Sequence, residues 1–235
     1  MEANEEQEGG RETARKVVIT ALLISTYICV GAYRSIPGPT LIDFKHILGI
    51  EMTSMPLILT ARALGYVAGC LIGGFIFHYL EVINKKKLFM SPFLFIMSMT
   101  ALAVPFCRSL VALSCTFFVS GICMIILSMG VNVYYFNIWR GDNIYYLTLQ
   151  TFYAVGSLLG PVIYGTSSQV SFSFINFKTL NSEADSRDFL KICYTYFVLS
   201  LMMFCISAMW IGMYRFTSVT IHVRDIFANG ESKVN

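Results

Sequence analysis

The side chains best suited to binding a small molecule lie inside long stretches that carry no charge. Asn132 and Gln150 are amides in two such stretches, Ser109–Trp139 and Asn143–Phe177. An amide inside a membrane must find hydrogen bonds, so each faces a partner helix or a polar cavity. Three tyrosines could add aromatic faces to one cavity: Tyr27, Tyr135 and Tyr153. These five residues fit a site for a sugar-sized ligand, and hydrogen bonding between helices explains them as well.

Arg62 is a charged residue inside an apolar run. It follows Pro56 by six residues, about 9 Å along a helix at 1.5 Å per residue. Burying an arginine there costs about 2.5–3.5 kcal/mol on insertion scales, so the side chain must reach headgroups, face water or meet a carboxylate. Asp43, at the outer end of the preceding apolar stretch, is the closest candidate partner. We expect either an Asp43–Arg62 pair or an Arg62 that extends to the outer headgroups.

Glycines recur every four residues in the same segment. Gly65, Gly69 and Gly73 share one helical face, which allows another backbone to approach closely. That backbone belongs either to another helix of this chain or to a second chain. A later segment holds Gly156, Gly160 and Pro161, which predicts a second flexible and closely packed stretch.

Several kinds of chemistry lack the residues that they need. Every carboxylate except Asp43 lies in a predicted loop or tail, which disfavours a proton relay through buried acids. The seven cysteines show no C-x-x-C spacing and the three histidines are far apart, so we expect no metal site. No paired acids or serine–histidine pair lie at matching depth, so we expect no enzyme. A net charge of +3 is too mild for a nucleic-acid surface.

The elements that must position these residues are membrane helices. The chain is 56% hydrophobic and 13% charged, whereas soluble domains carry about 25% charge. A bilayer core of about 30 Å needs about 20 apolar residues in a helix. The uncharged stretches therefore predict an all-α membrane protein with six transmembrane helices, at 17–43, 56–80, 88–107, 110–139, 144–168 and 192–214.

The basic residues predict which ends of these helices face the cytoplasm. With the N-terminus inside, ten lysines and arginines fall in the inner segments and six in the outer ones, as the positive-inside rule requires. The predicted organisation is an acidic cytoplasmic tail (1–16), the six-helix domain (17–214) and a cytoplasmic tail (215–235). Both termini are then cytoplasmic.

With these helices and motifs, the chain resembles the major facilitator superfamily. Within it, the chain is similar to the sodium-dependent glucose transporter 1 group, also called the major facilitator superfamily domain-containing protein 4 group. The resemblance extends over about 17–214. It rests on segments that run Gly38–Asp43, Arg62–Gly74, Pro105–Cys107, Gly130–Trp139 and Gln150–Pro161.

The resemblance implies a fold and a mechanism. The family has twelve helices in two six-helix halves, each half made of two inverted three-helix repeats, with substrate between the halves near the midplane. This chain is expected to supply the amino-terminal half alone. Uptake of glucose or a related sugar is then the implied function, in the plasma membrane, with no organic cofactor. Sodium is the candidate coupling ion, because serine hydroxyls and backbone carbonyls can bind it.

Two positions depart from the family's pattern. Ser128 stands where the fourth helix usually has an acid, two positions before Gly130. The cytoplasmic loop that usually forms a gate keeps its basic cluster but has His78 near the position of its acid. The expected gate residues are His78, Lys85, Lys86 and Lys87. Coupling to protons is therefore disfavoured.

Two functional interpretations remain open. The chain could be a sugar carrier that works as a homodimer or with a second half-transporter chain. It could instead be a truncated or accessory half that does not transport alone and associates with another membrane chain. Both place it in a lipid bilayer, and neither involves nucleic acid.

Overall fold

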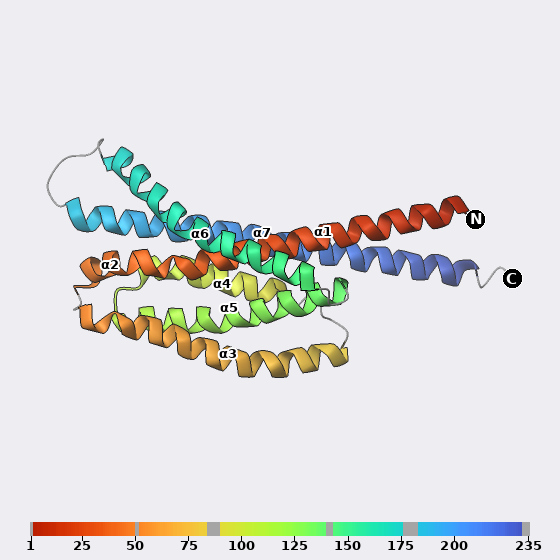
Figure 1. Ribbon diagram of the computed structural model, residues 1–235, viewed down its shortest axis with the longest axis horizontal. Coiled ribbons are helices and arrows are strands. Elements are labelled where there is room, and N and C mark those ends of the chain that lie inside the picture. Colours follow the sequence, from red (N-terminus) through yellow and green to blue (C-terminus); the bar gives the residue numbers. More distant parts are fainter. Residues whose placement is uncertain (1, 50–51, 84–89, 140–142, 176–182, 232–235) are drawn as a thin grey trace.

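A computed structural model shows a bundle of long, roughly antiparallel helices (Figure 1). It describes residues 2–49, 52–83, 90–139, 143–175 and 183–231, and side chains over narrower ranges within them. The elements are α1 (Glu2–Ser35), α2 (Pro37–Leu48), η1 (Met52–Ser54), α3 (Pro56–Ile83), α4 (Met90–Ala103), η2 (Val104–Phe106), α5 (Leu110–Ile138), α6 (Asn143–Ile175) and α7 (Glu183–Glu231). No strand occurs in these ranges.

The described helices form six segments, as the uncharged stretches predict, because α1 and α2 lie end to end. Five segments are long and apolar enough to cross a membrane: Thr13–Lys45, Pro56–His78, Leu110–Ile138, Ile144–Ser167 and Phe189–Arg215. The remaining one, Met90–Phe106, is shorter and ends in a 3₁₀ turn that contains Pro105. Several helices extend beyond their predicted ends. In particular, α1 begins at Glu2 and α7 runs to Glu231, both within the predicted tails.

The first segment is interrupted at Ile36. Pro37 and Pro39 lack N–H groups, so the helical bonds to the carbonyls of Tyr33 and Ser35 cannot form there. Thr40 resumes the helix, since both its N–H and its hydroxyl donate to the Ile36 carbonyl, at 3.3 and 3.0 Å. The sequence predicts this break from its two prolines.

The helices pack in two layers. In the first, α3, α5, α1 and α6 form a row in which neighbours contact one another. Behind this row, α4 packs on α5, α7 packs on α1 and α6, and α4 and α7 pack on each other. The opposite side of α1 and α5 is left without a helix from the described residues. The Glu2 end of α1 and the Glu231 end of α7 extend from the same end of the bundle (Figure 1).

Two serine pairs join α4 to α7. Ser98 and Ser200 each donate to the other's backbone carbonyl at 3.0 Å, and their hydroxyls are also 3.0 Å apart. One heptad away, Ser207 donates to the Ser91 carbonyl at 3.1 Å. Small residues that bond across helices are a common means of packing inside membranes.

The glycine face of α3 packs against α5. A Cβ added at Gly65 would collide with the Phe118 carbonyl, and one added at Gly121 would collide with the Arg62 carbonyl. Gly69 likewise lies against Ile122 on α5. This face is therefore covered by α5 of the same chain, and Gly121 on α5 allows the two backbones to come close. Of the two alternatives, the internal one is correct.

A matching contact joins α1 to α6. Here a Cβ at Gly31 would collide with the Tyr153 carbonyl, and one at Gly156 with the Ile28 carbonyl. Gly160 is packed in the same way against the Ala32 carbonyl and Ser35. The second tightly packed stretch predicted from Gly156 and Gly160 is therefore present, while Pro161 in the same helix is exposed.

The two glycine contacts correspond residue by residue. Gly121 follows Gly31 by 90 residues, and Gly156 follows Gly65 by 91. Each glycine faces the carbonyl that lies three residues before its partner glycine. Gly31 thus faces Tyr153 and Gly156 faces Ile28, just as Gly65 faces Phe118 and Gly121 faces Arg62. The α1–α6 contact is thus repeated by α5 and α3.

Candidate functional site

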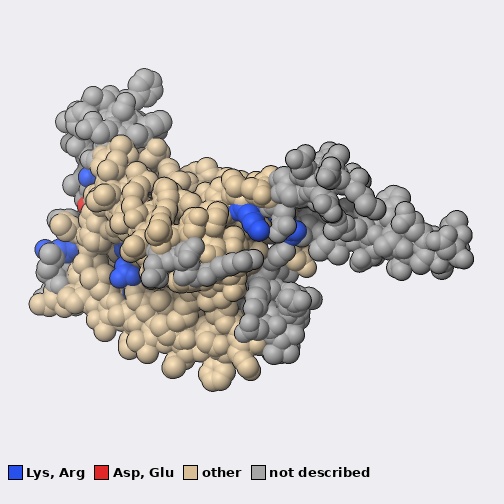
Figure 2. Space-filling model, turned by 45° about the vertical axis from the view of Figure 1, so that its right-hand side comes forward, with Lys and Arg blue, Asp and Glu red and all other residues tan. Residues whose placement is uncertain are grey.

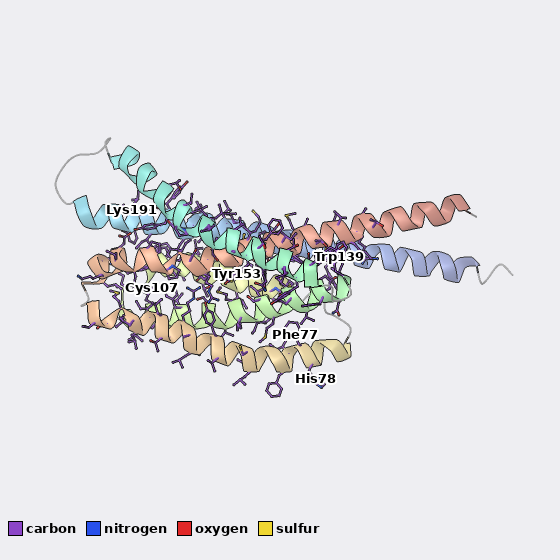
Figure 3. All side chains as sticks on the ribbon, in the orientation of Figure 1. Phe77, His78, Cys107, Trp139, Tyr153 and Lys191 are labelled. Atoms are coloured by element: carbon purple, nitrogen blue, oxygen red, sulfur yellow. The ribbon has the colours of Figure 1, made fainter. Side chains whose placement is uncertain are left out.

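Four of the five predicted cavity residues come together where α1, α5 and α6 meet. The Tyr27 hydroxyl donates to the Ser128 carbonyl at 3.5 Å, and the side-chain amides of Asn132 and Gln150 are its other polar neighbours. The Tyr27 and Tyr153 rings pack with their centroids 5.3 Å apart, tilted by 56°. Tyr153 lies on α6 where that helix crosses α1 (Figure 3). Two amides, a phenol and an aromatic face therefore share one place in the bundle.

Asn132 carries an unsatisfied group in this cluster. Its Oδ1 is buried and accepts no hydrogen bond within the described part of the chain. Leaving a buried acceptor unpaired costs about 1–3 kcal/mol. A ligand hydroxyl or a water molecule that donates to Oδ1 would recover that energy. The amide is thus suited to a polyhydroxylated ligand.

Tyr135, the fifth predicted residue, lies elsewhere. It is buried in the apolar core, and Tyr145 on α6 is its polar neighbour. Tyr146 is instead near enough to Tyr27 to interact with it electrostatically, and its ring stacks on that of Phe136 with the centroids 5.3 Å apart. The sequence contains a signal for Tyr146, since it precedes Gln150 by four residues and so shares its helical face.

Arg62 is buried, and the groups around its guanidinium in the described residues are a carbonyl, a sulfur and two aromatic rings. Its Nη1 donates to the Arg34 carbonyl at 3.2 Å, and its Nη2 lies 3.3 Å from the Met124 sulfur. Its guanidinium carbon is 5.7 Å from the Tyr33 ring centroid and 5.6 Å from that of Tyr66. Cation–π contacts of this kind contribute about 0.5–2 kcal/mol each. Only Nε, also buried, has no partner in the described residues.

Neither expectation for Arg62 is met. Asp43 is buried and accepts a hydrogen bond from the Tyr164 hydroxyl at 2.5 Å, so the predicted Asp43–Arg62 ion pair is not formed between these described residues. The side chain does not extend to the headgroups either, since it is only 5% exposed. The prediction fails because Arg62 packs toward α1 and α5, whose aromatic and carbonyl groups the spacing of charges cannot reveal.

Arg34 is a second arginine close to the Tyr66 ring. It lies inside α1, one turn after Gly31, and its side chain is exposed on the bundle. Its guanidinium carbon is 5.8 Å from the Tyr66 ring centroid, so Arg34 and Arg62 share one aromatic ring. Figure 2 shows a few separate lysine and arginine side chains on a surface that is mostly of other residue types.

The predicted gate is only partly within the described residues. His78 is exposed near the end of α3, toward the end of the bundle from which the termini extend, and Trp139 lies toward the same end (Figure 3). Lys85, Lys86 and Lys87 lie outside the described residues. Over the residues that are described, no group of three histidine, cysteine or acidic side chains is placed to hold a metal ion.

The chain is similar in sequence to several glucose transporters. It is 27% identical over 143 residues to sodium-dependent glucose transporter 1 of Homo sapiens, which covers 60% of this chain and 27% of the relative. It is 29% identical over 147 residues to sodium-dependent glucose transporter 1A of Mus musculus, and 25% identical over 153 residues to the Danio rerio protein.

These matches are partial. They cover 60% and 64% of this chain but only 32% and 25% of the Mus musculus and Danio rerio relatives. No family model and no solved structure matches the chain. The chain is a distant, partial homologue of sodium-dependent glucose transporter 1.

Proposed function

We propose that this chain is a membrane transporter of the major facilitator type that carries glucose or a related sugar. The observation that supports it most is the convergence of Tyr27, Asn132, Gln150 and Tyr153 from three helices, with a buried Asn132 oxygen left unpaired. Aromatic faces and neutral amides suit the hydroxyl groups and apolar ring faces of a sugar. The relatives are named as glucose transporters.

The fold that we propose is half of such a transporter, built from two inverted three-helix repeats. The corresponding contacts of Gly31 with Gly156 and of Gly121 with Gly65 support it. The helix packing supports it as well. If α5 is the equivalent of α1, and α3 the equivalent of α6, the contact between α1 and α6 corresponds to the contact between α5 and α3. In this arrangement α1 and α5 occupy equivalent central positions, and both contribute to the Tyr27 cluster.

A second half-bundle would complete the carrier. The side of α1 and α5 without a helix is flanked by α3 and α6, the least buried of the five long spans. Their exposed side chains are large and apolar, among them Leu64, Val67, Leu158 and Val162. In the proposed carrier these flanks meet a second copy or a separate half-transporter chain, and rocking of the halves exposes the site to each side in turn.

Uptake of labelled glucose into proteoliposomes that hold only this chain tests the proposal. We expect saturable uptake that Gln150→Ala reduces about tenfold or more, because a buried site that loses a hydrogen-bonding group discriminates strongly. Thr151→Ala is the matched control, since Thr151 is exposed and bonds only to the Leu147 carbonyl of its own helix. Replacing sodium with choline measures coupling to sodium.

An accessory half-transporter is the second candidate function. The uncovered side of α1 and α5 favours it. In that case the inserted chain gives no uptake alone but acquires it when a second half-chain is present. Saturable uptake by the chain alone that is equal in the wild type and in Gln150→Ala would contradict both candidates.

A further inference from the structure

Two arginines lie close to the middle of the described bundle. Gly31 contacts Gly156, which is at the centre of the span Ile144–Ser167. Arg34 follows Gly31 by three residues and Arg62 precedes Gly65 by three, which is about 4.5 Å along each helix. Since the hydrocarbon half-thickness is about 15 Å, both backbone positions are well inside it.

The Arg34 side chain is turned toward this middle region. In a helix the Cα–Cβ bond tilts toward the N-terminus, which for α1 is the direction of Gly31. Its guanidinium carbon lies 5.8 Å from the ring centroid of Tyr66, the residue directly after Gly65. Arg34 therefore does not extend toward the headgroups of the α2 end of the bundle.

The two charges differ in how they are compensated. Arg62 has a carbonyl, a sulfur and two aromatic rings around it. The Arg34 guanidinium contacts the Tyr66 ring and is otherwise exposed, and among the described residues no carboxylate pairs with either arginine. An exposed guanidinium at this depth is not stable against lipid tails, so a polar or anionic group must face it.

The exposed Arg34 side chain lies between α1 and the Tyr66 ring of α3, two helices that do not pack closely against each other. The other sides of α1 contact α5, α6 and α7. Tyr27 precedes Arg34 by seven residues, two helical turns, and so lies on the same stripe of α1. The cation and the Tyr27–Asn132 cluster therefore lie along one stripe of α1, with Arg34 exposed and Tyr27 buried.

We propose that Arg34, supported by Tyr66 and Arg62, forms an anion subsite that binds a carboxylate on the ligand, so that sugar acids bind in preference to neutral sugars. This inference rests on the proposed sugar site. A guanidinium binds a carboxylate through two parallel hydrogen bonds, and the ring behind it fixes its position. Lipid headgroup anions remain at the interface, more than half the depth of a leaflet away.

Thermal unfolding of the purified full chain in detergent, followed by tryptophan fluorescence, tests this subsite. The probes are sodium glucuronate, and glucose with an equal concentration of sodium chloride. A ligand that binds only the folded state raises the melting temperature with its concentration, which yields an apparent Kd. We expect glucuronate to bind about tenfold or more tightly than glucose, as suits a charge-assisted contact.

Three variants separate the outcomes. Arg34→Gln is expected to remove the preference for glucuronate and to leave glucose binding intact, while Arg34→Lys, which keeps the charge but loses the paired bonds, retains part of it. Arg108→Gln is the matched control, because Arg108 is exposed between η2 and α5. It should bind as the wild type does.

Three results would overturn the subsite. Equal binding of glucose and glucuronate in wild type and Arg34→Gln would leave the sugar site standing and reject the anion subsite alone. A preference for glucuronate that survives Arg34→Gln would assign the carboxylate to other residues. Stabilisation by neither probe in the folded chain would reject both the subsite and the proposed sugar site, and would direct attention to a carboxylate on a partner chain.

Discussion

At the scale of single residues, the site is defined by polar groups that are nearly but not fully satisfied. The Tyr27 hydroxyl has a long 3.5 Å bond to the Ser128 carbonyl, and Asn132 Oδ1 has no partner among the described residues. Fully satisfied polar groups, such as those of Ser98 and Ser200, hold helices together. In the proposed site, the groups left incomplete can still form a hydrogen bond with a ligand or a water molecule.

Tyr27→Phe tests this interpretation. The ring and its contact with Tyr153 remain, while the hydroxyl between Asn132 and Gln150 is lost. A neutral hydrogen bond contributes about 0.5–1.5 kcal/mol, so the Kd for glucose should rise about two- to tenfold. The thermal-shift titration measures the Kd, and Tyr164→Phe, whose hydroxyl bonds instead to Asp43, is the control. Unchanged affinity in Tyr27→Phe would show that the hydroxyl is not part of the site.

At the scale of elements, two glycine contacts set the positions of the site helices. Gly31 and Gly156 bring α1 against α6, and Gly65 and Gly121 bring α3 against α5. A side chain at any of these positions would meet backbone atoms, which cannot move aside as a flexible side chain can. The helices that position Tyr27 and Gln150 are therefore fixed by residues that have no side chain.

Substitution of matched glycines tests this role. Gly65→Ala and Gly156→Ala should each destabilise the bundle by about 1–3 kcal/mol, because they overpack a close contact. Gly74→Ala and Gly165→Ala, in the same two helices, meet nothing within 4 Å and should be neutral or stabilising. Melting temperatures of the four variants provide the comparison. Similar values for all four would mean that the crossings are looser than described here.

At the scale of the whole molecule, the sequence determines the helices better than their partners. Runs without charge locate six helical segments, and Pro37 with Pro39 locates the break after α1. These features are local. Whether the glycine face of α3 meets α5 or a second chain depends on Gly121, which lies in a distant part of the sequence and is identified only once the helices are paired.

The site shows the same limit. Polar residues in uncharged runs identify Asn132, Gln150, Tyr27 and Tyr153, because each is unusual for its surroundings. Tyr135 is equally unusual but points into the apolar core. Asp43 and Arg62 are close in sequence, yet the partners of Arg62 come from α1, α3 and α5. Depth in the membrane can be counted along the chain, whereas the direction of a side chain depends on how helices are rotated against one another.

The central claim is that the Tyr27–Asn132–Gln150–Tyr153 cluster binds a sugar, and equilibrium binding of labelled glucose to the purified chain tests it most directly. Asn132→Ala removes the unpaired oxygen, and Asn137→Ala, an exposed amide on the same helix, is its match. We predict saturable binding that Asn137→Ala leaves unchanged and that Asn132→Ala weakens about tenfold or more. Equal affinities in the two variants, or no binding by the folded wild type, would contradict the claim.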